Sequence, residues 1–87
     1  MGTFHQDRGE LHGITVVVET DASEVWVGRC DTADDRGVVL RDADVHRESS
    51  GRDAFLRSAS ELGVWPRHRQ VLIPSQSVAS IRRLGEL

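Results

Sequence analysis

Hydrophobic and polar side chains alternate with a period of two in three segments of the first half of the chain. Such alternation over about four to eight residues, with β-branched residues prominent, is typical of strands that bury one face. In the first segment Val16 and Val18 share a face, and in the third Val38 and Leu40 do so. The predicted strands cover residues 13–20, 25–30 and 38–47. Their spacing predicts an antiparallel meander in a small barrel or sandwich.

The period changes to that of a short helix in the second half of the chain. Phe55, Ala59 and Leu62 recur at helical spacing and predict one apolar stripe. We expect Ser50 to cap the start of this helix and Gly63 to end it. The predicted helix covers about residues 51–63.

Two apolar segments after the helix, residues 70–73 and 78–84, predict the last strands. Pro74 starts a tight turn between them, because its ring fixes φ and it has no N–H for a ladder, and Ser75 is expected to cap this turn. The fold class is therefore mainly β, a small five-stranded, SH3-sized antiparallel barrel. The helix is an insertion before strand four that the barrel should not need. A short fourth strand leaves an edge open, which favours assembly with another copy.

The chain of 87 residues is expected to form one domain over residues 11–87, after a flexible N-terminus of residues 1–10. The sequence contains no signal peptide and no membrane span, so we expect a cytoplasmic protein. A single cysteine, Cys30, excludes an internal disulfide and is expected to be a small apolar residue of the second strand.

The net charge of −3 is unevenly distributed. Residues 1–50 carry a balance of −6 and residues 51–87 a balance of +3, and all eleven basic residues are arginine. The acidic total argues against strong non-specific binding to nucleic acid, although the second half leaves room for a local basic face.

The sequence contains none of the motifs GxSxG, GxGxxG or the P-loop, so we expect no catalysis and no cofactor. The acidic residues of segment 31–35 lack the spacing of a calcium loop. Four histidines are too scattered to predict a metal site, namely His5, His12, His46 and His68.

The stretch from Gly13 to Leu84 resembles the Sm-like superfamily, which includes the LSm and Hfq proteins. Residues ITVVVET match the opening strand of its Sm1 motif, Gly28 matches the glycine at which the second strand bends, and Asp34 matches the loop aspartate. The segment VLIPSQSVASI resembles the Sm2 motif. The resemblance implies a five-stranded barrel that forms rings and binds RNA through its loops.

The RNA-binding loops depart from the family pattern. Gly37 follows the loop aspartate where the family usually has an asparagine that contacts a base. Pro74 and Ser75 follow Ile73, where the family commonly has Arg-Gly, and the Lys-His pair of Hfq is absent. The resemblance therefore supports the Sm-like fold for this chain more strongly than it supports an RNA-binding site.

Two turns are candidate ligand sites. Asp34, Arg36 and Gly37 form either an ordinary hairpin turn or the inner rim of a ring, where Arg36 would contact phosphate. Ser75 and Gln76 either shape the second turn or bind a base or a peptide near the same rim.

A third candidate is a cationic patch beside an aromatic side chain. This patch forms only if the basic segment 66–69 and the last strand lie side by side. Arginine with an aromatic is typical of binding to single-stranded RNA. The alternative is a solvated surface that offsets the acidic half of a neighbouring subunit. The residues are Trp65, Arg67, Arg69, Arg82 and Arg83.

The leading prediction is a homo-oligomeric Sm-like binding protein without catalysis, with single-stranded RNA as the first candidate ligand. The alternative is a scaffold barrel that keeps the assembly, has lost RNA binding and contacts a protein partner. Contacts between copies are expected at Val39, Val71, Ile73, Val78 and Ile81.

Overall fold

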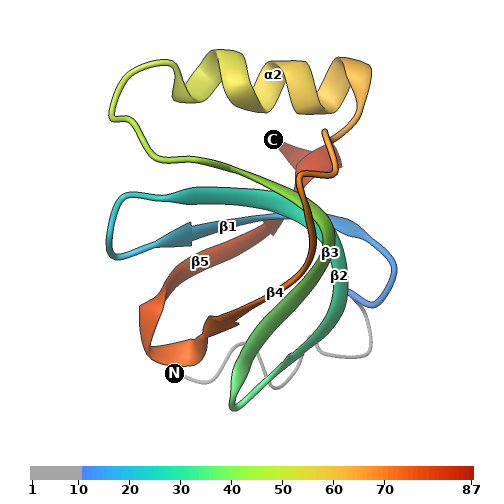
Figure 1. Cartoon of the computed structure of the whole chain (residues 1–87), viewed down its shortest axis with the longest axis vertical. Helices are drawn as coiled ribbons and strands as arrows, with labels where there is room; N and C mark the ends of the chain where they lie inside the picture. The colour runs from blue at the N-terminus through green and yellow to red at the C-terminus, as the bar shows by residue number, and fades with distance from the viewer. Residues whose placement is uncertain (1–10) are drawn as a thin grey trace.

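Five antiparallel strands form one sheet in the computed structural model, which describes residues 11–87 (Figure 1). The expected flexibility of residues 1–10 falls outside the described residues. The sheet order is β4-β3-β2-β1-β5, and α2 lies between β3 and β4 in the sequence. The elements are β1 Thr15–Thr20, β2 Val25–Asp34, β3 Gly37–His46, α2 Arg52–Leu62, β4 His68–Pro74, η1 Ser75–Ser77, β5 Val78–Arg83 and η2 Leu84–Glu86.

Strand β2 is longer than the sequence predicts, and β2 and β3 curl over the rest of the sheet (Figure 1). Residues 31–34, expected in a loop, continue β2, and three of them, Thr32, Ala33 and Asp34, pair with β3. Gly28 lies opposite two residues of β3, Asp42 and Ala43, so the ladder has a bulge at this point, and Asp42 has a φ of 53°. A bulge bends a strand and increases its twist. The two strands can therefore wrap around a core without a break.

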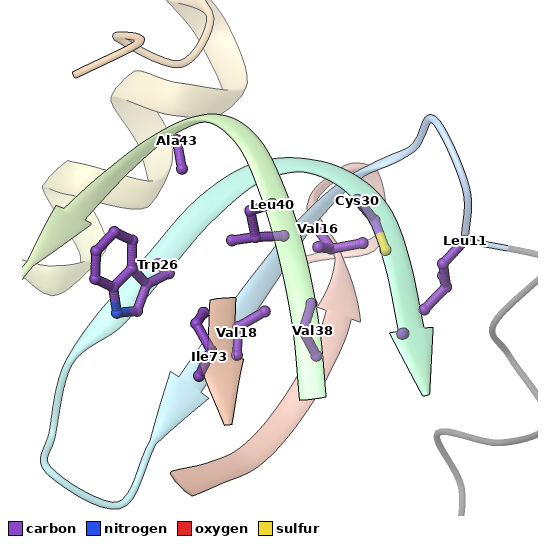
Figure 2. Close-up of a cluster of buried hydrophobic side chains, with 10 residues drawn as sticks. Leu11, Val16, Val18, Trp26, Cys30, Val38, Leu40, Ala43 and Ile73 are labelled. Carbon is purple, nitrogen blue, oxygen red and sulfur yellow. The ribbon is translucent and has the colours of Figure 1, made fainter. Parts of the chain in front are cut away.

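The inner face of the curled sheet carries the larger core (Figure 2). The predicted alternation is confirmed, since Val16 and Val18 are fully buried there together with Val38 and Leu40. Cys30 is also buried on this face. The remaining buried members are Leu11, Trp26, Ala33, Ala43 and Ile73.

A second, smaller core lies between the opposite face of the sheet and α2, which crosses that side in Figure 1. Val17, Val25 and Val27 are fully buried in it, and Ala59 of α2 packs with them. Phe55, Leu56 and Val64 pack against the same cluster. The helix thus covers a core of its own, which the sequence analysis did not predict.

The ends of α2 differ in how well the sequence predicts them. Gly63 ends the helix with a φ of 93°, and its N–H donates to the carbonyl oxygen of Ala59, as expected. The N-cap is Gly51, with a φ of 81° and no side-chain cap, so the expected Ser50 cap is wrong. The periodicity also places Leu62 on the buried stripe, but this side chain is 84% exposed, so that prediction is wrong. Leu56 packs against the core instead, together with Phe55.

The sheet is not closed, because β4 and β5 each pair with one neighbour and form its two edges. β4 begins earlier than predicted, at His68, and pairs with β3 as far as Pro74. Within residues 11–87, no helix has the length and apolar character to span a bilayer.

Candidate functional site

Local polar contacts shape the turn between β2 and β3. The Arg36 N–H donates to Oδ1 of Asp34 at 3.0 Å, and the Arg36 guanidinium lies 3.5 Å from the other carboxylate oxygen. The backbone N–H of Arg36, more than its charge, holds the pKa of Asp34 below the ordinary value. Gly37 has a φ of 145°, and a Cβ there would collide with the carbonyl oxygen of Ile73. Ordinary turn chemistry therefore accounts for Asp34 and Gly37.

This hairpin turn meets the turn between β4 and β5. The Ser75 N–H donates to the carbonyl oxygen of Arg36 at 3.0 Å. The backbone of Ser75 thus makes the contact, and no side chain caps η1, so the expected Ser75 cap is wrong. Gln76 follows and is exposed. The structure brings the residues of both candidate turns to one end of the sheet.

The charges at this end do not favour a phosphate group. The Arg36 guanidinium is 87% exposed, but it is bound to Asp34, and Asp35 adds a second carboxylate to the same turn. Two acidic side chains against one basic side chain give the turn a negative balance. A ligand there has to be recognised by hydrogen bonds more than by positive charge.

The arginines of the predicted cationic patch lie on opposite edges of the sheet. Arg67 and Arg69 lie at the start of β4, whereas Arg82 and Arg83 end β5. Trp65 is 68% exposed in the connector, which is the segment of residues 63–67 between α2 and β4. One chain therefore does not assemble these five residues into one surface.

Three of these arginines are bound to carboxylates. The guanidinium of Arg67 lies 3.4 Å from Asp44, that of Arg82 lies 3.0 Å from Glu19, and that of Arg83 lies 3.4 Å from Glu86. Arg69 is exposed and makes no ion pair with any of residues 11–87. Within one chain these pairs offset part of the positive charge that the sequence offered for nucleic acid.

Sequence reasoning missed a cluster around the buried indole of Trp26. Its Nε1–H donates to Glu24 at 3.2 Å, and the Arg47 Nε–H donates to the other carboxylate oxygen at 2.9 Å. The Arg47 guanidinium lies 5.7 Å from the indole centroid, and the His68 ring meets the indole edge-on at 5.1 Å. The cluster ties the end of β3 and the start of β4 to β2. No local sequence pattern could indicate it, because Arg47 and His68 lie far from Trp26 along the chain.

A hollow of about 240 Å³ lies between α2 and the connector. Leu62 and Trp65, both largely exposed, line it together with Phe55 and Val64. The sequence assigned Leu62 to the core and Trp65 to a basic patch, so this apolar surface was also missed.

The residues predicted to contact another copy lie on or beside the open edges. Ile73 is buried in the inner core, and Val71, Val78 and Ile81 are half-buried against it. Val39 is half-buried on β3, where it pairs with Leu72 of β4. Leu72, which the sequence analysis did not select, is 55% exposed.

The histidines of the described residues do not converge. His12 contacts the carbonyl oxygen of Asp31, His46 contacts that of Ser50, and His68 packs on Trp26. No group of three or more metal-binding side chains occurs within residues 11–87, and His5 falls outside them.

A curled antiparallel sheet of order β4-β3-β2-β1-β5 with an insertion between β3 and β4 defines the class of this protein: the fold is Sm-like. The predicted fold class and the resemblance behind it are confirmed. No family model and no curated protein matches the sequence.

Two solved structures show the likeness. The first is a novel Sm-like archaeal protein from Pyrobaculum aerophilum, with a TM-score of 0.64, 20% identity and coverage of 92% of this chain. This chain spans 50% of the length of that protein. The second is a chain of the NatC complex bound to CoA, with a TM-score of 0.59, 20% identity and coverage of 85% of this chain and 79% of that chain. Identities this low establish the fold alone.

Proposed function

We propose that this protein is a non-catalytic Sm-like assembly module. Copies pair through the open edges of their sheets, β4 of one with β5 of the next, and the assembly is a scaffold for a protein partner. The observation that carries the proposal is the pair of edge strands, each with one neighbour in a sheet that does not close.

The composition of both edges supports pairing. Soluble proteins usually protect an exposed edge with charged side chains, prolines or short strands. Residues 70–73 of β4 and 78–81 of β5 carry no charge and no proline. Leu72 adds an exposed apolar side chain at the first edge. The central residues of both edges therefore lack the usual barriers to pairing, and the charged residues lie at the start of β4, Arg69, and at the end of β5, Arg82 and Arg83.

The two edges differ, so their contact is head-to-tail. A head-to-tail contact closes into a ring when the rotation between copies divides a full turn, and otherwise it continues as a filament. An assembly built this way has one contact for each copy and presents the same outer surface many times. An assembly that presents the same surface many times is suited to act as a scaffold.

The surface chemistry favours a protein partner. The protein has a net charge of −3, and three of the four arginines of the expected patch are bound to carboxylates. Leu62 and Trp65 form an exposed apolar surface on the covering helix and the connector. The likeness to a chain of a protein complex, NatC, supports the same choice.

Single-stranded RNA is the second candidate. The observation in its favour is the hydrogen bond between Ser75 and Arg36, which joins the two candidate turns beside an exposed guanidinium. RNA carried through purification without nuclease would raise the ratio of absorbance at 260 nm to that at 280 nm. A purified oligomer with the ratio of pure protein excludes this candidate.

Edge-blocked variants test the proposed assembly. Leu72→Arg places a charge on the β4 edge and Ala79→Arg places one on the β5 edge, so either variant alone should be a monomer by native mass spectrometry. Mixed in equal amounts, they should form a dimer of one copy of each, because each retains the edge that the other lacks. Circular dichroism checks that both remain folded.

Exposed residues of the same type on α2 provide matched controls. Leu62→Arg and Ala54→Arg should keep the mass of the unmodified assembly, since neither lies on a sheet edge. Variants at the edges that assemble as well as these controls would overturn the proposal, as would blocked variants that do not combine.

A further inference from the structure

The start of β4 and the end of β5 carry arginines that lie on the two different edges of the sheet. Every strand pair of residues 11–87 is antiparallel, and antiparallel pairs are slightly more stable per residue than parallel pairs. An antiparallel contact between β4 and β5 of the next copy places the first residues of one strand beside the last residues of the other. Arg69 then lies at the same end of the shared ladder as Arg82 and Arg83 of the next copy.

Arg69 brings a positive charge that its own chain does not offset. It is exposed and makes no ion pair with any of residues 11–87. Asp42 faces it in the register of β3 and β4, but the Asp42 carboxylate is bound to Arg29 at 3.2 Å. The carboxylate opposite Arg69 in the ladder is therefore already bound to another arginine.

The other edge brings an excess of positive charge as well. Arg82 shares the carboxylate of Glu19 with Arg52, at 3.0 and 3.7 Å respectively. One carboxylate between two guanidinium groups leaves one positive charge without compensation. Pairing the two edges would therefore bring like charges together, which costs free energy unless an anion lies between them.

A hollow of about 310 Å³ lies along the β5 edge and offers space for such an anion. Leu11 and Ile81 line it together with Arg82, Arg83 and Glu86. Glu86 binds Arg83 at 3.4 Å, and its own side chain is 67% exposed. A stronger anion can displace an exposed carboxylate from a guanidinium at little cost.

We infer that Arg69 of one copy and Arg82 and Arg83 of the next form a binding site for a small polyphosphate anion, which promotes assembly. The site rests on the proposed edge-to-edge contact and is incomplete in a single chain. The guanidinium group donates two parallel hydrogen bonds to phosphate oxygens, so three of them suit an anion with several phosphate groups.

The test measures the protein concentration at half-assembly by native mass spectrometry, with and without sodium tripolyphosphate at constant ionic strength. We expect tripolyphosphate to lower this concentration by about tenfold, since a ligand that binds only the assembly stabilises it by mass action. Arg69→Gln should abolish the response and leave assembly without the anion unchanged or stronger. Glu86→Gln should enlarge the response, because it removes the competing carboxylate.

Arg57→Gln is the matched control. Arg57 is also exposed and makes no ion pair with any of residues 11–87, but it lies on α2 and belongs to neither edge strand. This variant should respond to tripolyphosphate as the unmodified protein does. An Arg69→Gln variant that still responds would overturn the inference.

A single-stranded oligouridylate forms the second arm. A response to tripolyphosphate identifies a free polyphosphate ligand, whereas a response to the oligonucleotide alone would overturn that assignment in favour of a nucleic-acid backbone. Assembly that ignores both anions overturns this inference and leaves the proposed function standing. A protein that remains monomeric under all conditions contradicts the proposed function itself.

Discussion

Gly28 sets how closely β2 and β3 approach each other. A Cβ at this position would lie 2.8 Å from the Cβ of Ala43 and 3.2 Å from the carbonyl oxygen of Arg41. We expect Gly28→Ala to lower the free energy of unfolding by about 1–3 kcal/mol, because the bulge has to open to admit a methyl group. Gly85→Ala is the control, since a Cβ there meets nothing within 4 Å. Urea unfolding that gives equal stabilities for the two variants would contradict this account of the bend.

Glu24 gives the fold a dependence on pH. The hydrogen bond from Arg47, and next that from Trp26, holds the pKa of Glu24 below its ordinary value of 4.5. A lowered pKa means that the carboxylate stabilises the fold above the pKa of the unfolded chain, and that this contribution is lost as pH falls through the folded pKa.

Glu24→Gln should therefore lower stability at pH 7, by about 1 kcal/mol or less for a partly exposed pair. The difference between this variant and the unmodified protein should shrink below pH 4.5 and disappear in more acidic solution. Thermal unfolding across this range measures it. A difference that stays constant with pH would show that the ion pair contributes nothing.

The residue scale also shows what the sequence could predict. Val16, Val18, Val38 and Leu40 were assigned to one face correctly, because alternation is a local property of a strand. The ion pair of Arg82 with Glu19 could not be predicted, since it depends on β5 lying beside β1. A local sequence pattern does not indicate contacts that depend on the order of the strands in the sheet.

At the scale of elements, α2 is the part of the fold whose role the sequence described least well. Its stripe predicted a helix of nearly the observed length, but periodicity alone does not show which surface a helix covers. The three consecutive valines of β1 contained a signal, because a strand with apolar residues on both faces is usually covered on both. The covering element is α2.

We expect the cover to be essential for stability. Ala59→Asp would bury a charge against Val17, Val25 and Val27, and should cost about 2 kcal/mol or more in unfolding free energy. Ser60→Asp changes the adjacent, exposed position and should alter stability by less than about 0.5 kcal/mol. Urea unfolding compares the two. Equal stabilities would mean that α2 is the dispensable insertion that its sequence position suggests.

For the whole molecule, the order of strands decides which candidate residues can act together. It brings the turns at Arg36 and Ser75 to one end, and it separates Arg69 from Arg82. The sequence predicted the five strands and their class, because each strand and turn has its own signal. It could not predict that the arginines lie on two different edges, where they become neighbours only if copies of the chain assemble.

Native mass spectrometry of the unmodified protein tests this account most directly. Spectra recorded over a range of protein concentrations should show one closed oligomer of identical copies, which falls to monomers when either edge is blocked by Leu72→Arg or Ala79→Arg. A monomer at every concentration would contradict assembly through β4 and β5.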